Sequence, residues 1–353
     1  MVTRRTATAL LLAAAAAPAL GAKAPAVKVP TRGFNLPDWL ADNARIPDEG
    51  TLDMLHGLGF ETIRLPVDPD FILNTDAAQI GSVLRTATDH GFNAIVDMHP
   101  GGSLDFDGDF DGAATRLDDA WQKLAAIIAD TSPEQVYPEL LNEPPMEPEA
   151  FHPLRDRLAE TVRRACPDHT LVWGPARYQG IWELDGSKPL DDANTIVAVH
   201  YYTPMGFTHQ CLNWDDSSPL RLIKNLPFPA TRKSPEVKAL AAEFEAAGDQ
   251  GMLDYLNGEF DGPWTVDHID EDFATLGKWS KKHKTPVMLN EFGVLNFCVD
   301  ATSRTNWVRA VREAAERNHV GWTYWEADQG FGFVSDRGPG AAVDQPMLDA
   351  LLT

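Results

Sequence analysis

The chain has 353 residues, of which 44% are hydrophobic, and this is enough apolar material for a large core. Its formal net charge of -22 at pH 7 repels phosphate backbones and anionic lipids. Nucleic acid and membranes are therefore poor partners, whereas a neutral substrate is not disfavoured. The three cysteines do not form the close pairs of a zinc site.

Residues 1–22 have the pattern of an export signal. Arg4 and Arg5 precede an apolar run from Ala7 to Leu20, and small residues follow it. A short N-terminal helix is the alternative, but this run offers no polar face to water. We therefore expect a secreted or periplasmic protein that loses this segment. Its net charge would move from -22 to -24, because two arginines and no acidic residue are removed.

After a Pro- and Ala-containing linker at 23–30, strand-like and helix-like segments alternate from residue 31 to residue 353. Apolar runs with turn residues at their ends indicate strands, and longer periodic segments indicate helices. The expected strands are 32–36, 61–67, 93–99, 137–141, 170–174, 195–202, 286–293 and 321–325. The clearest helices are 48–58, 77–90, 114–129, 149–165 and 345–352.

Eight strands alternating with helices predict an α/β fold, a (β/α)8 TIM barrel, rather than an open doubly wound sheet. The segment 207–264 is too long for one loop and helix, so we expect an insertion after strand six. No linker or composition shift marks a second domain. We therefore expect residues 31–353 to form a single domain.

Polar side chains follow most of these strands, and in a barrel the carboxyl ends of the strands converge on one site. Two strands end in the same pair, Asn142-Glu143 and Asn290-Glu291. Two carboxyl groups facing each other across a pocket can cleave a glycosidic bond. Each of the other residues at strand ends could serve packing alone, but six of eight strands carry such a residue at the same end when the two glutamate strands are counted. The residues on the other four strands are Arg64, Asp97, His99, His200, Tyr202 and Trp325.

The motifs at these positions follow one another in the order seen in glycoside hydrolase family 5, the cellulase family. The chain resembles this family from about Gly33 to Phe333. The motifs are Ile63-Arg64-Leu65-Pro66, Asp97-Met98-His99, Leu141-Asn142-Glu143-Pro144, His200-Tyr201-Tyr202, Asn290-Glu291-Phe292-Gly293 and Trp325.

The resemblance implies a retaining glycoside hydrolase, an endo-β-1,4-glucanase without cofactor or metal, acting as a monomer on a neutral β-glucan or related saccharide. It implies that Glu143 is the general acid/base and Glu291 the nucleophile, with their carboxyl groups ~5 to 5.5 Å apart. At that distance we expect the charge on Glu291 to disfavour ionisation of Glu143.

The resemblance also implies substrate-binding roles for the neighbouring residues. Arg64 and Tyr202 would hold the nucleophile ionised and oriented. Asn142 would bond the sugar 2-hydroxyl, and His99 and His200 would position the sugar or the acid/base residue. Trp325 would offer a flat face to a pyranose ring. Further aromatic candidates for outer sugar subsites are Trp39, Trp214 and Phe331.

Two other features have a structural interpretation beside a functional one. The segment 105–111 alternates carboxylates as calcium loops do, but Phe110 stands at position six, where that pattern has a glycine, and Arg116 at position twelve, where it has a glutamate ligand. This favours a solvated acidic loop. Cys211 and Cys298 follow neighbouring strands, so a disulfide between them is one expectation, with Cys166 a buried thiol.

Other activities remain open from the sequence. The same scaffold could support a β-mannanase, a xyloglucanase or an exo-β-glucosidase. A metal-dependent sugar isomerase would use Asp97, His99, Glu143, His200 and Glu291 as ligands, but an arginine such as Arg64 does not help to bind a cation. A non-catalytic sugar-binding protein is disfavoured because both glutamates are present.

Overall fold

The computed structural model describes residues 27–353. The expected export signal and most of the expected linker lie outside these residues. Within the described part of the chain, no helix is both long enough and apolar enough to cross a membrane.

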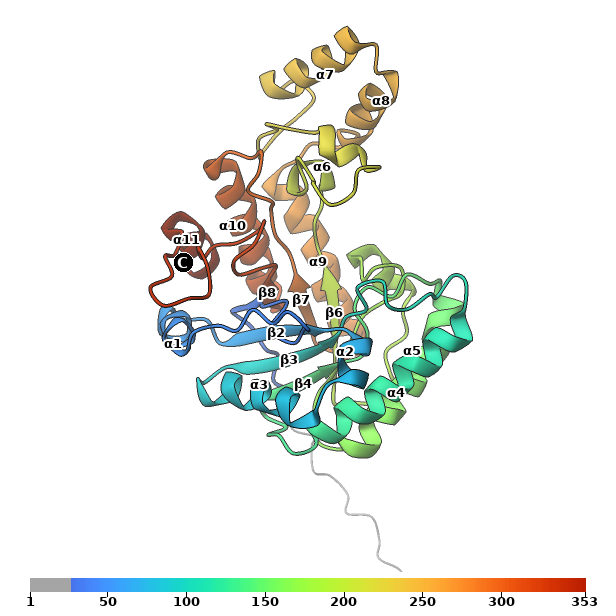
Figure 1. Cartoon of the computed structure of the whole chain (residues 1–353). Coiled ribbons are helices and arrows are strands. Elements are labelled where there is room, and N and C mark those ends of the chain that lie inside the picture. The colour runs from blue at the N-terminus through green and yellow to red at the C-terminus, as the bar shows by residue number, and fades with distance from the viewer. Residues whose placement is uncertain (1–26) are drawn as a thin grey trace, which may run out of the picture.

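Eight parallel strands in the described residues close into a barrel in the order β1 to β8, which confirms the predicted fold class (Figure 1). Each strand pairs in register with its neighbours in the chain, and β8 pairs with β1 through Gly33 and Thr323. The strands are β1 (Gly33–Asn35), β2 (Thr62–Val67), β3 (Asn93–Met98), β4 (Val136–Glu139), β5 (Leu171–Trp173), β6 (Thr195–His200), β7 (Val287–Glu291) and β8 (Gly321–Tyr324).

The barrel interior contains one small cluster of apolar side chains. This inner cluster consists of Ile95, Tyr137, Val172, Ile196, Ala198 and Met288, each at most 1% exposed. Successive side chains of a strand point to opposite faces. Asp97 lies two residues after Ile95 on β3, and Glu139 lies two residues after Tyr137 on β4, so both point inward as well. The inner face therefore changes from apolar to charged at the carboxyl ends of the strands.

The helices cover the outside of the barrel with apolar stripes. In α4 (Phe110–Ile128) the buried positions recur three or four residues apart, as in Leu117, Trp121 and Leu124. Trp121 also donates a hydrogen bond from Nε1 to the Leu140 carbonyl at 2.8 Å, which ties this helix to the end of β4. The other helices around the barrel are α1 (Glu49–Leu58), α2 (Pro69–Asn74), α3 (Ala77–Asp89), α5 (Pro148–Ala165), α9 (Val266–His283), α10 (Ala301–Arg317) and α11 (Gln345–Leu352).

An insertion separates β6 from its barrel helix α9, as predicted. It contains α6 (Met205–Thr208), α7 (Pro235–Ala247) and α8 (Gln250–Glu259), and Figure 1 shows α7 and α8 projecting away from the barrel. A disulfide between Cys211 and Cys298, with a Cα–Cα distance of 5.9 Å, joins the insertion to the loop after β7. Cys166 is a buried free thiol. Both cysteine expectations are confirmed.

The prediction that the fourth strand reaches Leu141 is wrong, because β4 ends at Glu139. The backbone amide of Leu140 still donates to the Val172 carbonyl at 2.9 Å, but that of Asn142 turns back to the Met98 carbonyl at 2.8 Å. Glu143 then adopts a positive φ of 42°. The carboxylate that ends the strand is therefore Glu139, and Glu143 lies on the loop beyond it.

Candidate active site

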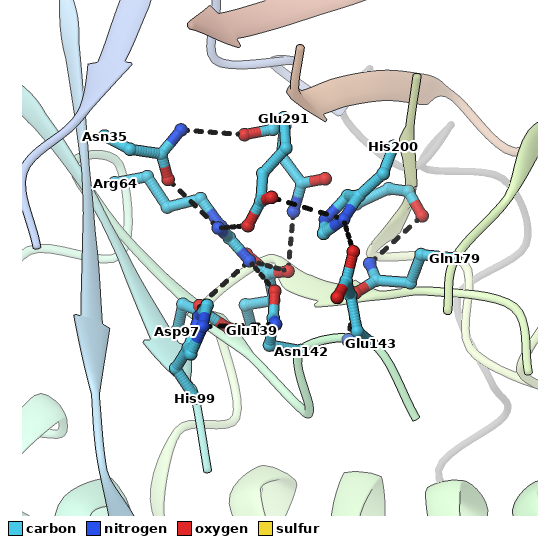
Figure 2. Close-up of polar contacts among 12 residues, drawn as sticks. Asn35, Arg64, Asp97, His99, Glu139, Asn142, Glu143, Gln179, His200 and Glu291 are labelled. Carbon is cyan, nitrogen blue, oxygen red and sulfur yellow. Dashed lines mark hydrogen bonds and ion pairs between the residues drawn. The ribbon is translucent and has the colours of Figure 1, made fainter. Parts of the chain in front are cut away.

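The eight main candidates from the sequence lie at the carboxyl end of the barrel, and direct contacts join them into one site. Figure 2 shows six of them: Arg64, His99, Asn142, Glu143, His200 and Glu291. Arg64 belongs to β2, His200 to β6 and Glu291 to β7. The remaining candidates sit just beyond strand ends: His99, Asn142, Glu143, Tyr202 and Trp325.

The two glutamates face each other across the site. One carboxylate oxygen of Glu143, one of Glu291 and a ring nitrogen of His200 all lie within 4.8 Å of one another. The Nδ1 atom of His200 is 2.7 Å from Glu143 Oε1 and 3.4 Å from Glu291 Oε2. This proximity fits the retaining arrangement of ~5 to 5.5 Å and not the inverting one of ~6.5 to 9.5 Å, which leaves room for a water.

Glu291 is held by two donors. Arg64 Nη1 lies 2.6 Å from its Oε1, and the Tyr202 hydroxyl donates to its Oε2 at 3.0 Å. Burial raises the pKa of Tyr202 well above its usual range, and the neighbouring Glu291 and Glu143 add to the rise. The phenol therefore keeps its proton and remains a donor. Both contacts were expected from the sequence.

Arg64 is the centre of a wholly buried ionic cluster that the sequence only partly revealed. Its Nε and Nη2 atoms form a two-point pair with Glu139 at 2.8 and 2.9 Å, and Nη2 also lies 2.9 Å from Asp97 Oδ2. With Glu291, one guanidinium thus faces three carboxyl groups. Burial raises the pKa of Asp97 to about 7, although Arg64 opposes the rise. Burial likewise raises the pKa of Glu139.

The sequence analysis missed Glu139 and Asn35. Asn35 Oδ1 accepts from Arg64 Nη1 at 3.0 Å, and its amide donates to the Asn290 carbonyl at 2.9 Å. Asn290 in turn donates to Glu139 Oε1 at 2.6 Å. The signal for Glu139 was present, because a glutamate in a buried apolar strand needs a cationic partner.

Glu143 is the more accessible of the two glutamates, with 38% of its side chain exposed against 6% for Glu291. Burial raises the pKa of Glu143, and His99 and Arg64 oppose the rise. The sequence analysis ascribed the protonated state of Glu143 to the charge on Glu291. In the structure the rise comes instead from desolvation, and its direction is the one that a general acid needs.

The two histidines are neutral members of the site. Burial lowers the pKa of His200 to about 4 and also lowers that of His99. His99 Nδ1 lies 2.7 Å from Asp97 Oδ2, and Asn142 Nδ2 is 3.3 Å from His99 Nε2. The His99 ring stacks on Trp325, with centroids 5.8 Å apart and planes 16° apart. His99 thus lies toward one face of the indole, which favours the other face for a pyranose ring.

A cleft of about 540 Å³ runs outward from Glu143 between the loops after β4, β5 and β6. Its exposed aromatic wall is formed by Tyr178 and Trp182, which are 58% and 66% exposed. The sequence analysis missed both, although Trp182 follows the fifth strand closely enough to suggest a loop at this end of the barrel.

The three aromatic residues considered for outer sugar subsites differ in how much of each is exposed. Trp39 and Phe331 are only 4% and 5% exposed, so the prediction that they offer ring faces to a sugar is wrong; both pack into the core. Trp214 is 59% exposed and lies beside His209, at a centroid distance of 6.2 Å.

Among the described residues, donor atoms suited to a metal ion come together at the two glutamates. The grouping with three candidate ligand atoms is Glu143, His200 and Glu291, where Arg64 already lies against the Glu291 carboxylate. A cation there would compete with a fixed guanidinium. In the acidic loop, Asp105 and Asp109 instead accept the backbone N–H groups of Gly108 and Gly112. This is the hydrogen bonding of turns and helix caps.

Comparisons with known proteins agree with this geometry. The family model described as Cellulase (glycosyl hydrolase family 5) matches residues 22–330. Endoglucanase 3 of Fibrobacter succinogenes is 24% identical, over 88% of this chain and 51% of that protein. Cellodextrinase A of Ruminococcus flavefaciens is 21% identical, over 82% of this chain and 83% of that protein. The chain thus spans about half the length of Endoglucanase 3.

Solved structures share the barrel. The cellulose synthase subunit Z (CcsZ) of Clostridioides difficile superposes with a TM-score of 0.73 at 22% identity, covering 92% of this chain and all of that one. Thermotoga maritima Cel5A in complex with mannotriose gives a TM-score of 0.72 at 24% identity, covering 91% and 97%. At these identities the likeness shows the fold.

Proposed function

The chain belongs to glycosyl hydrolase family 5, the cellulase family, and on this premise we propose that it hydrolyses β-1,4-glucosidic bonds by double displacement, with Glu143 as acid/base and Glu291 as nucleophile. The observation that carries the proposal is the approach of the two carboxylates to within 4.8 Å. At that separation one carboxylate can attack the anomeric carbon while the other serves the leaving oxygen.

In the first step Glu143 gives its proton to the glycosidic oxygen as the bond from that oxygen to the anomeric carbon breaks. A Glu291 oxygen forms a bond to the same carbon, and the product is a covalent glycosyl-enzyme. In the second step Glu143, now ionised, takes a proton from a water that attacks the anomeric carbon and releases Glu291. Arg64 and Tyr202 supply the charge and the hydrogen bond that keep Glu291 ionised and aimed.

Substrate recognition in this proposal uses the groups around the reacting pair. Asn142 Oδ1 is bound to Arg64 Nη2 at 2.8 Å, which leaves its amide to His99 or to a sugar hydroxyl. The free face of Trp325 suits the apolar face of a pyranose ring. The relatives' names, Endoglucanase 3 and Cellodextrinase A, favour a β-glucan.

A β-mannanase is the second candidate, because Cel5A of Thermotoga maritima was crystallised with mannotriose. A sugar isomerase is disfavoured because Arg64 lies against the carboxylate that a metal would need. Exhaustive dialysis against a chelator distinguishes a metal-dependent isomerase from a hydrolase of the proposed type, because only the hydrolase keeps its activity.

We further propose that residues 31–353 act as one exported, monomeric catalytic domain on a neutral saccharide. The export signal is the basis for its location.

Glu143→Gln and Glu291→Gln should each lower hydrolysis of a β-1,4-glucan by several orders of magnitude, on the order of 10³ or more, while the fold persists. Glu147→Gln is a matched control, because Glu147 lines the same cleft but is 68% exposed and pairs only with Arg177. Proton NMR of the first product should show a retained β-anomer. Near-wild-type activity in either variant, or an α-anomer as first product, would remove the assignment.

Measuring products on carboxymethylcellulose, glucomannan, mannan and aryl glycosides then identifies the saccharide. Oligosaccharides released first from a β-glucan indicate endo action, whereas glucose alone indicates an exo-β-glucosidase. Faster release from mannan than from any glucan would replace the glucanase proposal with the mannanase.

A further inference from the structure

The loop after β5 has an unusual backbone. Three successive residues that are not glycine, Arg177, Tyr178 and Gln179, have positive φ angles of 50°, 65° and 56°. Each such residue is strained relative to a right-handed conformation. A run of three persists only where surrounding contacts hold it in place.

Those contacts reach the loop that carries Glu143. The backbone amides of Arg177 and Tyr178 donate to the carbonyls of Met146 and Pro144 at 3.3 and 3.1 Å. Gln179 turns inward and is completely buried (Figure 2). Its Oε1 accepts the backbone N–H of Glu143 at 2.6 Å. The loop after β5 is therefore fastened to the loop after β4 at three successive residues.

Gln179 also fastens the site to β6. Its Nε2 donates to the Ala198 carbonyl at 3.3 Å, and its own carbonyl accepts the backbone N–H of His200 at 2.9 Å. His200 in turn places Nδ1 2.7 Å from the Glu143 carboxylate. One residue thus connects two parts of the site: its side chain holds the backbone of Glu143, and its backbone carbonyl holds that of the histidine that contacts the Glu143 carboxylate.

The strand before the loop leaves room for this side chain. A Cβ atom added to Gly174 would lie 2.3 Å from both Cγ and Nε2 of Gln179. Glu143 itself has a positive φ of 42°, so its backbone is strained as well. A single amide side chain therefore occupies a space made by a glycine and holds the strained backbone of Glu143.

We propose that Gln179 is a positioning residue for the acid/base step: it fixes the backbone of Glu143 and of His200 together, so that the Glu143 carboxyl lies where it can protonate the leaving oxygen. This inference rests on the proposed function of Glu143. Without Gln179 the Glu143 carboxyl turns toward solvent, and proton delivery weakens while attack by Glu291 does not.

The choice of leaving group separates this role from a merely structural one. A sugar alcohol leaves only with a proton from Glu143, whereas a dinitrophenolate leaves without one. General acid catalysis contributes about 10²- to 10⁴-fold. In Gln179→Met, kcat on cellotetraose should fall by about 10²-fold, and kcat/KM on dinitrophenyl β-cellobioside by less than about threefold.

A second variant reaches the same side chain indirectly. Gly174→Ala adds a methyl group whose nearest neighbours are atoms of the Gln179 side chain, and it should give the same leaving-group pattern. The control is Gln210→Met. Gln210 is also completely buried and also bridges two backbone segments, since it accepts from Leu226 at 2.7 Å and donates to Phe207 at 3.1 Å, but it lies in the insertion. Any loss of activity in Gln210→Met should be equal on the two substrates.

Equal losses on both substrates in Gln179→Met, or no loss, would overturn the inference. If the wild-type enzyme cleaves neither compound, the proposed function is refuted rather than the role of Gln179. A measurement without substrate then still tests that role. Carbon NMR titration should show the pKa of Glu143 falling toward that of a solvated glutamate in Gln179→Met but not in Gln210→Met. An unchanged Glu143 titration overturns the inference.

Discussion

Replacing Arg64 with methionine should destabilise the protein in a strongly pH-dependent way. Arg64 is 0% exposed and is the cation shared by Asp97, Glu139 and Glu291. Removing one partner of a buried ionic cluster costs about 3 to 5 kcal/mol, because charges are left without compensation. We expect Arg64→Met to lower the free energy of unfolding by that amount at pH 8.

The sign of the pH dependence follows from the carboxyl groups. Arg64 lowers the pKa values of Asp97 and Glu139, against the larger effect of burial, so its loss raises both further. Consider a carboxyl group whose pKa is higher in the folded state than in the unfolded state. Its contribution to protein stability is fully present at pH values below the unfolded pKa, near 4, and is lost as pH rises through the folded pKa. At pH values above the folded pKa, each further unit by which that pKa is raised lowers the free energy of unfolding by about 1.4 kcal/mol.

Urea unfolding at pH 5 and pH 8 measures this difference. The destabilisation in Arg64→Met should at least halve at pH 5, because the buried carboxyl groups are then protonated. Arg155→Met is the matched control: Arg155 is 2% exposed, but its carboxylate partner Asp156 is 57% exposed and its guanidinium stacks on Trp173. The cost of its loss should change much less between the two pH values, because the titrating neighbour that it affects is His152, whose pKa Arg155 lowers together with burial. An equal cost for Arg64→Met at pH 5 and pH 8 would refute the reasoning.

Three further predictions concern stability and binding. Burial lowers the pKa of His209 to about 4, so its contribution to stability is present above pH 6.5 and is lost as pH falls; His209→Asn should reduce the fall in thermal midpoint between pH 7 and pH 4.5, and an unchanged fall contradicts this. The Cys211–Cys298 bridge closes 87 residues, so replacing both cysteines with serine should cost about 4 to 5 kcal/mol in urea unfolding, whereas Cys166→Ala should leave the effect of a reductant unchanged. Trp325→Ala should lower kcat/KM on cello-oligosaccharides by about 10- to 200-fold, and a loss below twofold would show that its free face carries no sugar.

Much of the barrel follows from local sequence. Apolar runs such as Asn93–Met98 are buried on both faces, and that pattern is what a parallel strand between helices requires. The position of Arg64, Glu143 and Glu291 at one end also follows from sequence, since strands in a barrel are parallel and end on the same side. The disulfide was open from the sequence because spacing alone does not place two sulfurs within bonding distance.

The errors have a common cause. The fourth strand was extended to Leu141 because its two leucines look like strand core, whereas the backbone of Asn142 finds a partner in β3 and leaves the sheet. Trp39 and Trp182 both look like loop tryptophans, yet one is 4% and the other 66% exposed. Hydrophobic pattern tells which residues are buried on average but not which face a loop side chain turns to.

The sequence by itself determined the eight-stranded order and the residues at the strand ends, because side-chain alternation and turn residues are local properties. Only the tertiary structure decided that one arginine serves three carboxyl groups and that Gln179 joins the backbones of Glu143 and His200. Such contacts connect strands far apart in the chain, as Arg64 and Glu291 are, and they form only when barrel closure brings strand ends together. Closure also removes water from the site, and that desolvation, more than any neighbouring charge, raises the pKa of Glu143.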